Sequence, residues 1–515
     1  MNYLSPCPLP ADESVVTAWD SELRRIKTPW IEQILAEQGQ ELFQRFTTSY
    51  NEIRALPRTV RRALQRNLAR SEDAAIPADW RRRLAYSIAG AALLIALGQT
   101  ISEAKGPKPI KLSTKCSLYN AIYAAEYANT TGYPVTKKSY SYSGCQASPG
   151  PTIIALPKNA SISASYLPPI SGNITIQGVA AKKPKKGQPP PPPGTGGRIT
   201  GNSIFFVNDG GSLTLQNVTV QGSSSVYNGG AIYNAGSVSI VDSVISGTAP
   251  IGGAIFNSGN LSLNHSNVSN STADYGGGIY NIGNLTVTNN STITGNHANY
   301  DGGGIDNAYS ATITNSTIST NTAARNGGGI AIGVPYGRLS IGSSTLTGNS
   351  AFKGGSLHNA HTLIATSITI SNSNANYGGG LFNDDQADAV ITSSTVSGNH
   401  ATVSPSVYNN KTYYVGGYGG GINNHGGLTI NSSTINGTNT AEGKYVAYSQ
   451  SNYGGKGGGI HNSSYIYLNG SSVTGNTALF VAGGIYNLPP PDATLQINNS
   501  TISGNTAAAH ADVYP

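Results

Sequence analysis

The chain has 515 residues, of which 64 are glycine, and its formal net charge is +7. Only 11% of the residues are charged, against about 25% in an ordinary globular protein. Because no nucleic-acid-binding motif accompanies the positive charge and no Cys/His cluster has metal-ligand spacing, we expect no nucleic-acid partner, no metal and no cofactor.

The first 80 residues differ in composition from the rest of the chain. They contain all three tryptophans, and apolar residues at helical spacing, such as Trp30, Ile34 and Leu35, predict α-helices within 13–70. We interpret residues 1–80 as a helical cytoplasmic leader that contacts the export machinery or the inner face of the membrane.

An export signal is predicted at residues 81–104. Arg81–Arg83 precede a mostly apolar, uncharged stretch at 84–98, and small residues precede a predicted cleavage point after Ala104. This order is typical of a signal peptide, and the stretch is shorter than the roughly 20 apolar residues of a transmembrane helix. Two export interpretations stay open, a cleaved signal and an uncleaved anchor, and a buried core helix is the third. Either export interpretation places residues 105–515 outside the cytoplasm.

A basic segment separates this signal from the repeats. Residues 105–198 contain 12 basic residues and one acid, and the proline run Pro189–Pro193 follows four lysines in a predicted exposed loop. Cys116 and Cys145 both lie in this segment. Two cysteines in a chain bound for an oxidising compartment most simply form a disulfide.

The rest of the chain, 199–515, consists of tandem repeats. Each copy has a Gly-Gly-(Ala/Gly)-Ile motif, a Gly/Asn turn, an alternating strand and a Ser-Thr-Ile-Ser/Thr-Gly-Asn segment, and most copies follow one another after 23 to 27 residues. The β-branched alternation excludes a helical array, and the period is too short for a propeller blade. Three short strands per copy predict an all-β, right-handed parallel β-helix of about ten or more coils.

Stacked coils should bring equivalent residues of the repeats into columns. The isoleucine of the motif predicts a buried apolar ladder, and the asparagine two residues later predicts amides that bond from coil to coil. The clearest members are Ile232, Ile255, Ile279, Ile305 and Ile330, and Asn234, Asn257, Asn281 and Asn307.

Two repeats carry insertions, at 402–418 and 439–456. Both insertions precede the Gly-Gly strand in successive coils, so we expect them to lie side by side at one corner. Loops that project from one face of a solenoid often carry function, and tyrosine suits the recognition of proteins and sugars. Insertion without function is the alternative. The candidate contact residues are Tyr408, Tyr413, Tyr414, Tyr445, Tyr448 and Tyr453.

The segment Cys116–Ile122 (CSLYNAI), followed by two alanines, resembles the opening module of CSLREA-type bacterial β-helix surface proteins. Tyr119 and Asn120 replace the usual Arg-Glu pair of that module. The repeats also resemble those of polymorphic outer membrane proteins, which act in adhesion. Together these resemblances cover about 110–515 and imply an exported β-helix of the cell surface or outer membrane. They also imply a capping helix within 110–130 that a Cys116–Cys145 disulfide staples.

The main alternative is an enzyme, a polysaccharide lyase or glycoside hydrolase of the pectin-lyase-like fold. Such chemistry needs two or three carboxylates on one face, and the one acidic cluster, Asp384, Asp385 and Asp388, is a weak candidate. We expect no Arg or Lys of a neighbouring coil to face that cluster. We also expect three histidines to be too far apart in coil number to meet as a metal site: His358, His425 and His461.

A second alternative is ice or crystal binding through outward threonines. Thr292 and Thr294 face outward in the predicted strand, and Thr or Ser pairs recur in later coils, with Asn436 and Ser472 as exceptions. The leading hypothesis remains a noncatalytic, secreted or surface protein that is adhesin-like or structural and binds glycans or cell surfaces. The last coil is a candidate site of end-to-end self-association.

Overall fold

The structure is a computed structural model that divides into two units, Met1–Lys108 and Pro109–Pro515. The predicted helical leader and the predicted export signal lie outside the described residues, apart from isolated positions between 43 and 93. Within the part of the chain that is described, no helix has the length and apolar character needed to cross a membrane. The second unit is described at 109–129, 140–179, 191–202, 204–224, 226–408, 411–446 and 451–515.

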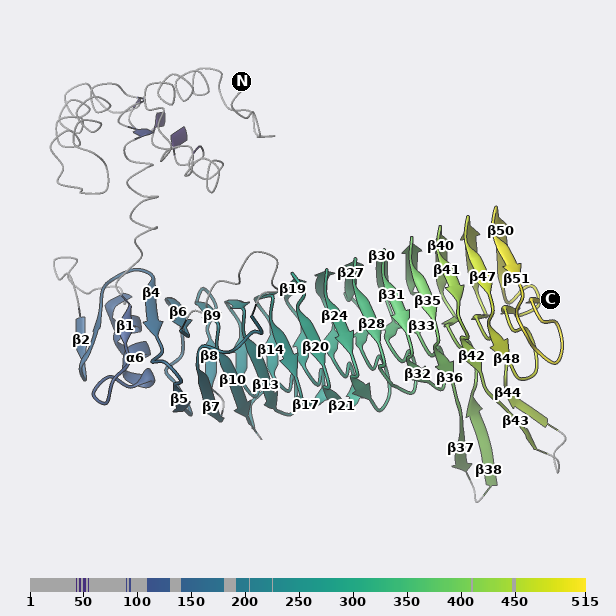
Figure 1. The fold of residues 1–515 in the computed structure, drawn as a ribbon, viewed down its shortest axis with the longest axis horizontal. Helices are drawn as coiled ribbons and strands as arrows, with labels where there is room; N and C mark the ends of the chain where they lie inside the picture. The colour runs from purple at the N-terminus through teal and green to yellow at the C-terminus, as the bar shows by residue number, and fades with distance from the viewer. Residues whose placement is uncertain are drawn as a thin grey trace. The chain divides into compact units, whose positions relative to one another are not determined.

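The second unit is a parallel β-solenoid of about 13 turns (Figure 1). A 14-stranded sheet runs from β1 (Ile110–Lys111) to β50 (Thr494–Asn498), and a 12-stranded sheet runs from β8 (Phe205–Val207) to β52 (Val513–Tyr514). A 16-stranded sheet, which includes β20 (Thr292–Thr294), forms another wall. The predicted fold class is confirmed, and the cap and the repeats belong to one unit.

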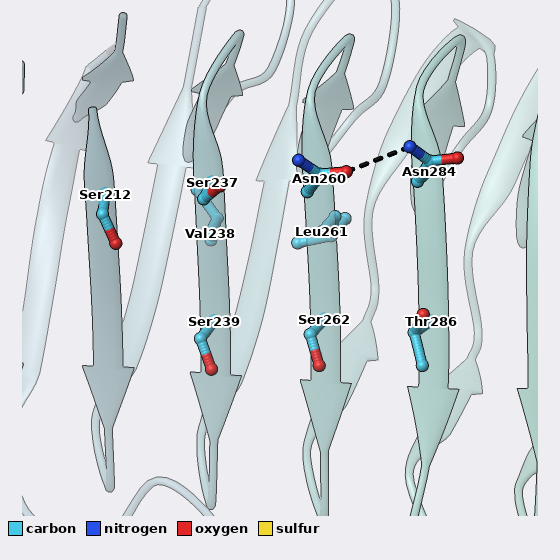
Figure 2. A pocket seen from close by; sticks show the side chains of 9 residues that line it. All are labelled: Ser212, Ser237, Val238, Ser239, Asn260, Leu261, Ser262, Asn284 and Thr286. Atoms are coloured by element: carbon cyan, nitrogen blue, oxygen red, sulfur yellow. Dashed lines mark hydrogen bonds between the residues drawn. The ribbon is translucent and has the colours of Figure 1, made fainter. Parts of the chain in front are cut away.

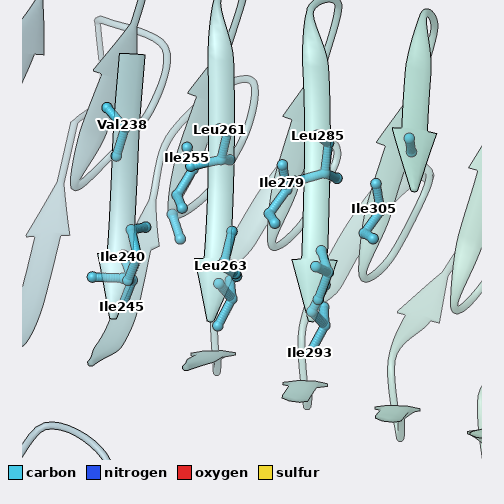
Figure 3. Close-up of a cluster of buried hydrophobic side chains, with 14 of the residues drawn as sticks. Val238, Ile240, Ile245, Ile255, Leu261, Leu263, Ile279, Leu285, Ile293 and Ile305 are labelled. Atoms are coloured by element: carbon cyan, nitrogen blue, oxygen red, sulfur yellow. The ribbon is translucent and has the colours of Figure 1, made fainter. Parts of the chain in front are cut away.

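The isoleucines of the Gly-Gly motif form the predicted ladder. Ile232, Ile255, Ile279, Ile305 and Ile330 are successive Cα partners in the 12-stranded sheet, and all five are fully buried. Figure 3 shows three of them pointing into the interior, beside leucines of the 14-stranded sheet. Each buried side chain of this kind contributes roughly 1.5–3 kcal/mol, so the repeated ladder supplies much of the driving force for stacking.

The predicted asparagine ladder also forms, and its members are fully buried. The Nδ2 of Asn257 donates to the Oδ1 of Asn281 at 2.6 Å, and equivalent bonds join Asn234 to Asn257 and Asn281 to Asn307. Each amide also donates to a backbone carbonyl of the next coil. The ladder stops where Ile332 pairs with Asn307. It resumes through Asn359, Asn383, Asn424, Asn462 and Asn487.

A second amide ladder, which the sequence analysis did not predict, is formed by the last residue of the Ser-Thr-Ile-Ser/Thr-Gly-Asn segment. The Nδ2 of Asn321 donates to the Oδ1 of Asn349 at 3.1 Å. A Cβ on Gly304 would lie 2.6 Å from the backbone oxygen of Gly329 and 3.1 Å from the Nδ2 of Asn321, so the third glycine of the motif leaves room both for the next coil and for this amide. Where Ser373 replaces the asparagine, Ser356 replaces that glycine, and the two hydroxyls hydrogen bond at 2.8 Å.

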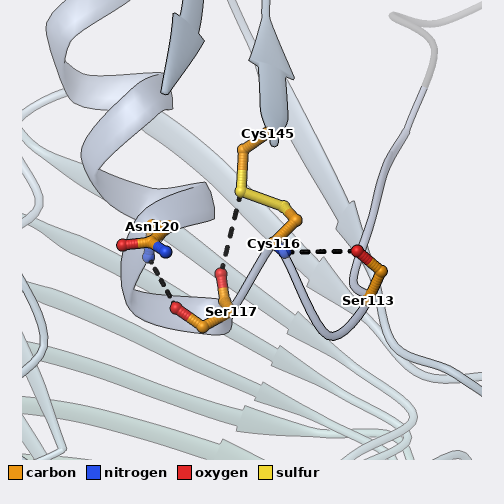
Figure 4. The surroundings of a disulfide bond; sticks show 5 residues. All are labelled: Ser113, Cys116, Ser117, Asn120 and Cys145. Carbon is orange, nitrogen blue, oxygen red and sulfur yellow. Dashed lines mark hydrogen bonds between the residues drawn. A yellow bond between two sulfur atoms is a disulfide. The ribbon is translucent and has the colours of Figure 1, made fainter. Parts of the chain in front are cut away.

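A helix covers the N-terminal end of the coil stack, as the resemblance implied. This helix, α6 (Leu118–Asn129), buries Leu118, Ala121 and Ile122. A disulfide joins Cys116 to Cys145 (Figure 4), and the hydroxyl of Ser117 accepts a hydrogen bond from the backbone N–H of Asn120, which caps the helix. The capping helix therefore begins at Leu118 and not near residue 110. Ile110 and Lys111 instead form β1, which pairs in the 14-stranded sheet with β4 (Thr152–Ala155).

Glu126 ties the cap to the first coils. Its carboxylate accepts hydrogen bonds from the backbone N–H groups of Ser171 and Gly172 at 3.0 to 3.1 Å. Such a bond between a charged acceptor and backbone donors contributes more than a neutral one. The helix is therefore attached at its beginning by the disulfide and near its end by this carboxylate.

Candidate functional site

Two antiparallel hairpins leave the solenoid at the predicted insertions. The first pairs β37 (Val403–Tyr408) with β38 (Lys411–Gly416), and the second pairs β43 (Gly443–Val446) with β44 (Ser451–Gly454). Figure 1 shows both projecting from the same side, near the C-terminal end of the coil stack. The expectation that both insertions join one corner and lie side by side is confirmed.

One buried amide fixes the base of the first hairpin. The Nδ2 of Asn376, which is 8% exposed, donates to the backbone oxygen of Thr402 at 3.1 Å and to the hydroxyl of Ser404 at 2.8 Å. Gly417, at a φ of +75°, follows the first hairpin at a place where a Cβ would come within 2.0 Å of the backbone oxygen of Glu442, the residue directly before the second hairpin. The bases of the two hairpins therefore pack directly against each other.

The hairpins also touch through aromatic side chains. The ring centroids of Tyr414 and Tyr453 are 5.9 Å apart, and the Nζ of Lys444 is 5.9 Å from the ring of Tyr414. Tyr413 and Tyr445 are 41% and 55% exposed, so they are available to a partner. Of the other two predicted contact residues, Tyr448 lies outside the described residues, and only the backbone of Tyr408 is described.

The structure separates the acidic cluster into different environments. The Oδ2 of Asp384 is 3.3 Å from the Nε2 of His358, and this hydrogen bond is the main reason that the pKa of Asp384 falls to about 2. Asp385 is exposed, with its Oδ1 3.8 Å from the Nδ1 of His425. Asp388 begins β34 (Asp388–Thr392) on the outer face of the 14-stranded sheet. The three carboxylates therefore do not share one face.

One expectation about this region is wrong, and the expected separation of the histidines is wrong for one pair of them. Lys353, from a neighbouring coil, has its Nζ 4.6 Å from the ring of Phe382 and helps to lower the pKa of Asp384, so a cation does face the cluster. His425 and His461 belong to consecutive coils, because the insertion between them lengthens the chain without separating the coils, whereas the coil of Phe382 lies between His358 and His425. His425 and His461 have ring centroids only 6.5 Å apart.

These histidines are part of a column of rings along the 12-stranded sheet. Phe382 stacks between His358 and His425, at centroid distances of 5.5 and 5.1 Å. His461 stacks on Tyr486, and burial is the main reason that its pKa falls to about 3, so its ring is neutral at physiological pH. Among the described residues, no group of three or more His, Cys, Asp or Glu side chains could hold a metal ion.

A buried acid that the sequence analysis did not single out lies in an earlier part of the same column. Asp306 pairs in register with Tyr280, is 8% exposed, and has its pKa raised to about 8, first by burial and then by Asp301. Asp301 itself forms an ion pair with Arg325 at 2.6 Å. The carboxyl of Asp306 is therefore largely protonated at neutral pH, and its burial keeps it from a polymeric substrate.

The outward threonines form a regular array on the 16-stranded sheet. Pairs of hydroxyls bond across coils, as between Thr294 and Ser319 at 3.0 Å and between Ser371 and Thr347 at 3.0 Å. The array is interrupted by Asn436 and Ser472, as the sequence indicates. Its first column runs in register through Thr292, Thr317, Thr345, Thr369, Thr395 and Thr434.

A shallow groove of about 260 Å³ lies on the outer face of the 14-stranded sheet. Figure 2 shows Ser237, Asn260 and Asn284 in a row on adjacent strands, with the Nδ2 of Asn284 donating to the Oδ1 of Asn260 at 3.0 Å. The lining contains only hydroxyl, amide and aliphatic side chains. It therefore has no acid or base for hydrolysis.

No protein-family model, curated protein or solved structure matches this chain. The fold and the candidate site therefore define only a class, a parallel β-solenoid that carries two rigidly based, tyrosine-bearing hairpins.

Proposed function

We propose that this protein is an exported, noncatalytic β-helix protein, adhesin-like or structural, that binds a glycan or a cell surface through its two hairpins. The observation that supports this most is the pair of hairpins itself, since they interrupt an otherwise regular solenoid and expose tyrosines beside each other. The proposed location is the surface of a bacterium or its surroundings.

The construction of the hairpins favours binding. Asn376 and the close approach of Gly417 to Glu442 hold the bases in place, so little conformational entropy is lost when a partner binds. Exposed tyrosines supply large, rigid contact surfaces with a polar hydroxyl. Tyr413 and Tyr445 are both exposed and both lie on these anchored hairpins.

The likeness of the cap and repeats to CSLREA-type and polymorphic outer membrane proteins supports the exported and adhesive parts of the proposal. The cap helix and its disulfide are compatible with an oxidising compartment. Anchoring through 84–98 and association of two copies at their last coils remain part of the same proposal.

Binding can be tested with the full chain on a glycan array and on cells. We expect the double variant Tyr413→Ala/Tyr445→Ala to weaken binding at least about tenfold, as loss of aromatic contacts at an interface commonly does. The matched control is Tyr465→Ala/Tyr467→Ala. Both control tyrosines are exposed, at 56% and 38%, but lie on the 14-stranded sheet. Equal binding by the hairpin variant and the parent would contradict the proposal.

The rival function, polysaccharide cleavage, is weaker because the acidic residues do not converge. Asp384 is paired with His358, and Asp388 lies on another face. Lyase and hydrolase assays on acidic glycans should show no turnover. Turnover that disappears when Asp384, Asp385 and Asp388 are each changed to Asn would establish an enzyme instead.

The threonine array supports a second candidate, ice or crystal binding. Six threonines in register make a regular hydroxyl surface. We expect Thr345→Tyr, in the middle of the array, to abolish any inhibition of ice recrystallisation, whereas the hairpin variant should not change it. Absence of such inhibition in the parent protein would eliminate this candidate.

A further inference from the structure

A groove of about 340 Å³ lies near the capped end of the solenoid, outside every site predicted from the sequence. Its floor includes the last residues of three neighbouring strands, β7 (Arg198–Asn202), β10 (Thr219–Ser223) and β13 (Val244–Thr248). Asn202, Ser223 and Thr248 pair in register, so their side chains form a polar row at roughly 4.8 Å intervals.

Exposed apolar side chains border this polar row. Tyr166 is 65% exposed, Tyr227 is 56% exposed and Val226 is 74% exposed. All three line the groove. A cluster of large exposed side chains beside a concave surface is typical of a binding site.

The backbone holds Tyr166 in an unfavourable conformation that presents its ring outward. Its φ is +52°, in the left-handed region that bulky residues rarely adopt. The backbone N–H of Tyr166 donates to the oxygen of Asn202 at 3.3 Å, and the N–H of Asn202 donates to the hydroxyl of Ser165 at 3.0 Å. Strain of this kind is often found at functional sites.

The polar row retains hydrogen-bonding capacity. The hydroxyl of Ser223 donates to the Oδ1 of Asn202 at 2.6 Å, which orients the amide. The Nδ2 of Asn202 and the hydroxyl of Thr248 have no hydrogen-bond partner among the described residues. Both groups are exposed and free to bond a ligand.

The groove contains no charged side chain. Arg198 lies four residues back along β7, roughly 13 Å from Asn202, and its guanidinium donates to Gln221. A polyanion would therefore find no cation in the groove to neutralise it. A pyranose ring, with apolar C–H faces and polar hydroxyl edges, matches tyrosine rings beside amide and hydroxyl groups.

We propose that this groove binds a neutral oligosaccharide, with Tyr166 and Tyr227 packing on the sugar faces and Asn202 and Thr248 bonding the hydroxyls. This site is separate from the hairpins and does not depend on the function proposed for them.

Isothermal titration of the full chain with neutral hexasaccharides of glucose, xylose and N-acetylglucosamine tests the proposal, with polygalacturonate as the anionic comparison. We expect at least one neutral oligosaccharide to bind, and Tyr227→Ala and Tyr166→Asn each to weaken it at least about tenfold. Asparagine tolerates the left-handed region, so Tyr166→Asn removes the ring without adding backbone strain. Tyr336→Ala is the matched control, since Tyr336 is 66% exposed but outside the groove.

The proposal would be overturned by no binding of any neutral oligosaccharide, by unchanged binding in both groove variants, or by preference for polygalacturonate. The hairpin variant Tyr413→Ala/Tyr445→Ala should bind the oligosaccharide as the parent does. Loss of binding in that variant would place the sugar site at the hairpins and likewise overturn the proposal. The groove proposal and the hairpin proposal can therefore be contradicted independently of each other.

Discussion

The coils of the solenoid and its two hairpins are stabilised in different ways. In the coils, strands pair with the equivalent strands of the neighbouring coils, and buried amides such as Asn281 repeat the same bond from coil to coil except at Ile332. The hairpins pair only within themselves and are attached through a few groups, chiefly Asn376. We infer that substitutions in the coils change stability, whereas substitutions in the hairpins change binding with little effect on stability.

The strongest test of the comparison interrupts the buried ladder. Asn281→Ala leaves Asn257 and Asn307 without their amide partner inside the core, and we expect it to lower the free energy of unfolding by about 3 kcal/mol or more, because each buried unpaired group costs 1–3 kcal/mol. Denaturant unfolding measures the change. Asn284→Ala is the matched control, since Asn284 makes a similar amide bond on the exposed face. An equal decrease in the free energy of unfolding in both variants would mean that burial does not determine how much an amide bond of the ladder stabilises the protein.

The next effect depends on pH. The pKa of Asp306 is about 8 when folded and near 3.8 when unfolded, so the folded state keeps a proton that the unfolded state loses. Stability should therefore fall as pH rises from about 4 to 8, by up to a few kcal/mol, since one pKa unit corresponds to about 1.4 kcal/mol.

Thermal unfolding of the parent and Asp306→Asn across this range isolates that contribution from the other groups that titrate. The groups facing Asp306 are Asp301, Arg325 and Tyr280, and they remain in the variant. The variant should show a flatter profile. Parallel profiles would show that the carboxyl is not buried as described.

A third test asks whether the size of the residue at the third glycine of the motif is coupled to the size of the residue beside it in the second amide ladder. Gly304→Ala should cost about 1–3 kcal/mol, because its Cβ would lie 2.6 Å from the backbone oxygen of Gly329 and would also crowd the amide of Asn321 at 3.1 Å. Adding Asn321→Ser should recover part of that loss, as the natural pair Ser356 and Ser373 indicates. A double-mutant cycle from denaturant unfolding measures this coupling, and strict additivity would contradict it.

The smallest effect on global stability is expected at the hairpin base. Asn376→Ala removes the bonds to Thr402 and Ser404, and we expect a loss of about 1 kcal/mol together with faster proteolysis within 403–416. Binding through the hairpins should weaken because the loop is no longer preorganised. Limited proteolysis with mass spectrometry measures the local change. Unchanged cleavage would show that the hairpin does not depend on this anchor.

Much of the fold could be predicted because the solenoid repeats a local pattern. The spacing of Ile232, Ile255 and Ile279 predicted which residues stack, and the amide ladder followed from the asparagine two places later. The resemblance at Cys116–Ile122 implied the cap and its disulfide. The second amide ladder was missed, although the recurrent final asparagine was visible in the repeat, because its partner, the third glycine, is recognised only once the coil is closed.

The corners of the coils were predicted less well. The insertions were placed correctly, but His425 and His461 were expected to be far apart in coil number, whereas they lie in adjacent coils with their ring centroids 6.5 Å apart. The approach of Lys353 to Phe382 and Asp384 was also missed, because it depends on how side chains of adjacent coils pack at the corner. Insertions change the sequence separation but not the coil spacing.

The sequence by itself therefore determined the period, the buried ladders, the cap and the position of the hairpins, because each depends on a repeated or local pattern of residues. Only the tertiary structure decided which side chains meet at the corners. The burial of Asp306, the division of Asp384 from Asp388, and the groove between Tyr166 and Tyr227 all depend on turn geometry and on the packing of successive coils, which a pattern along one chain does not specify.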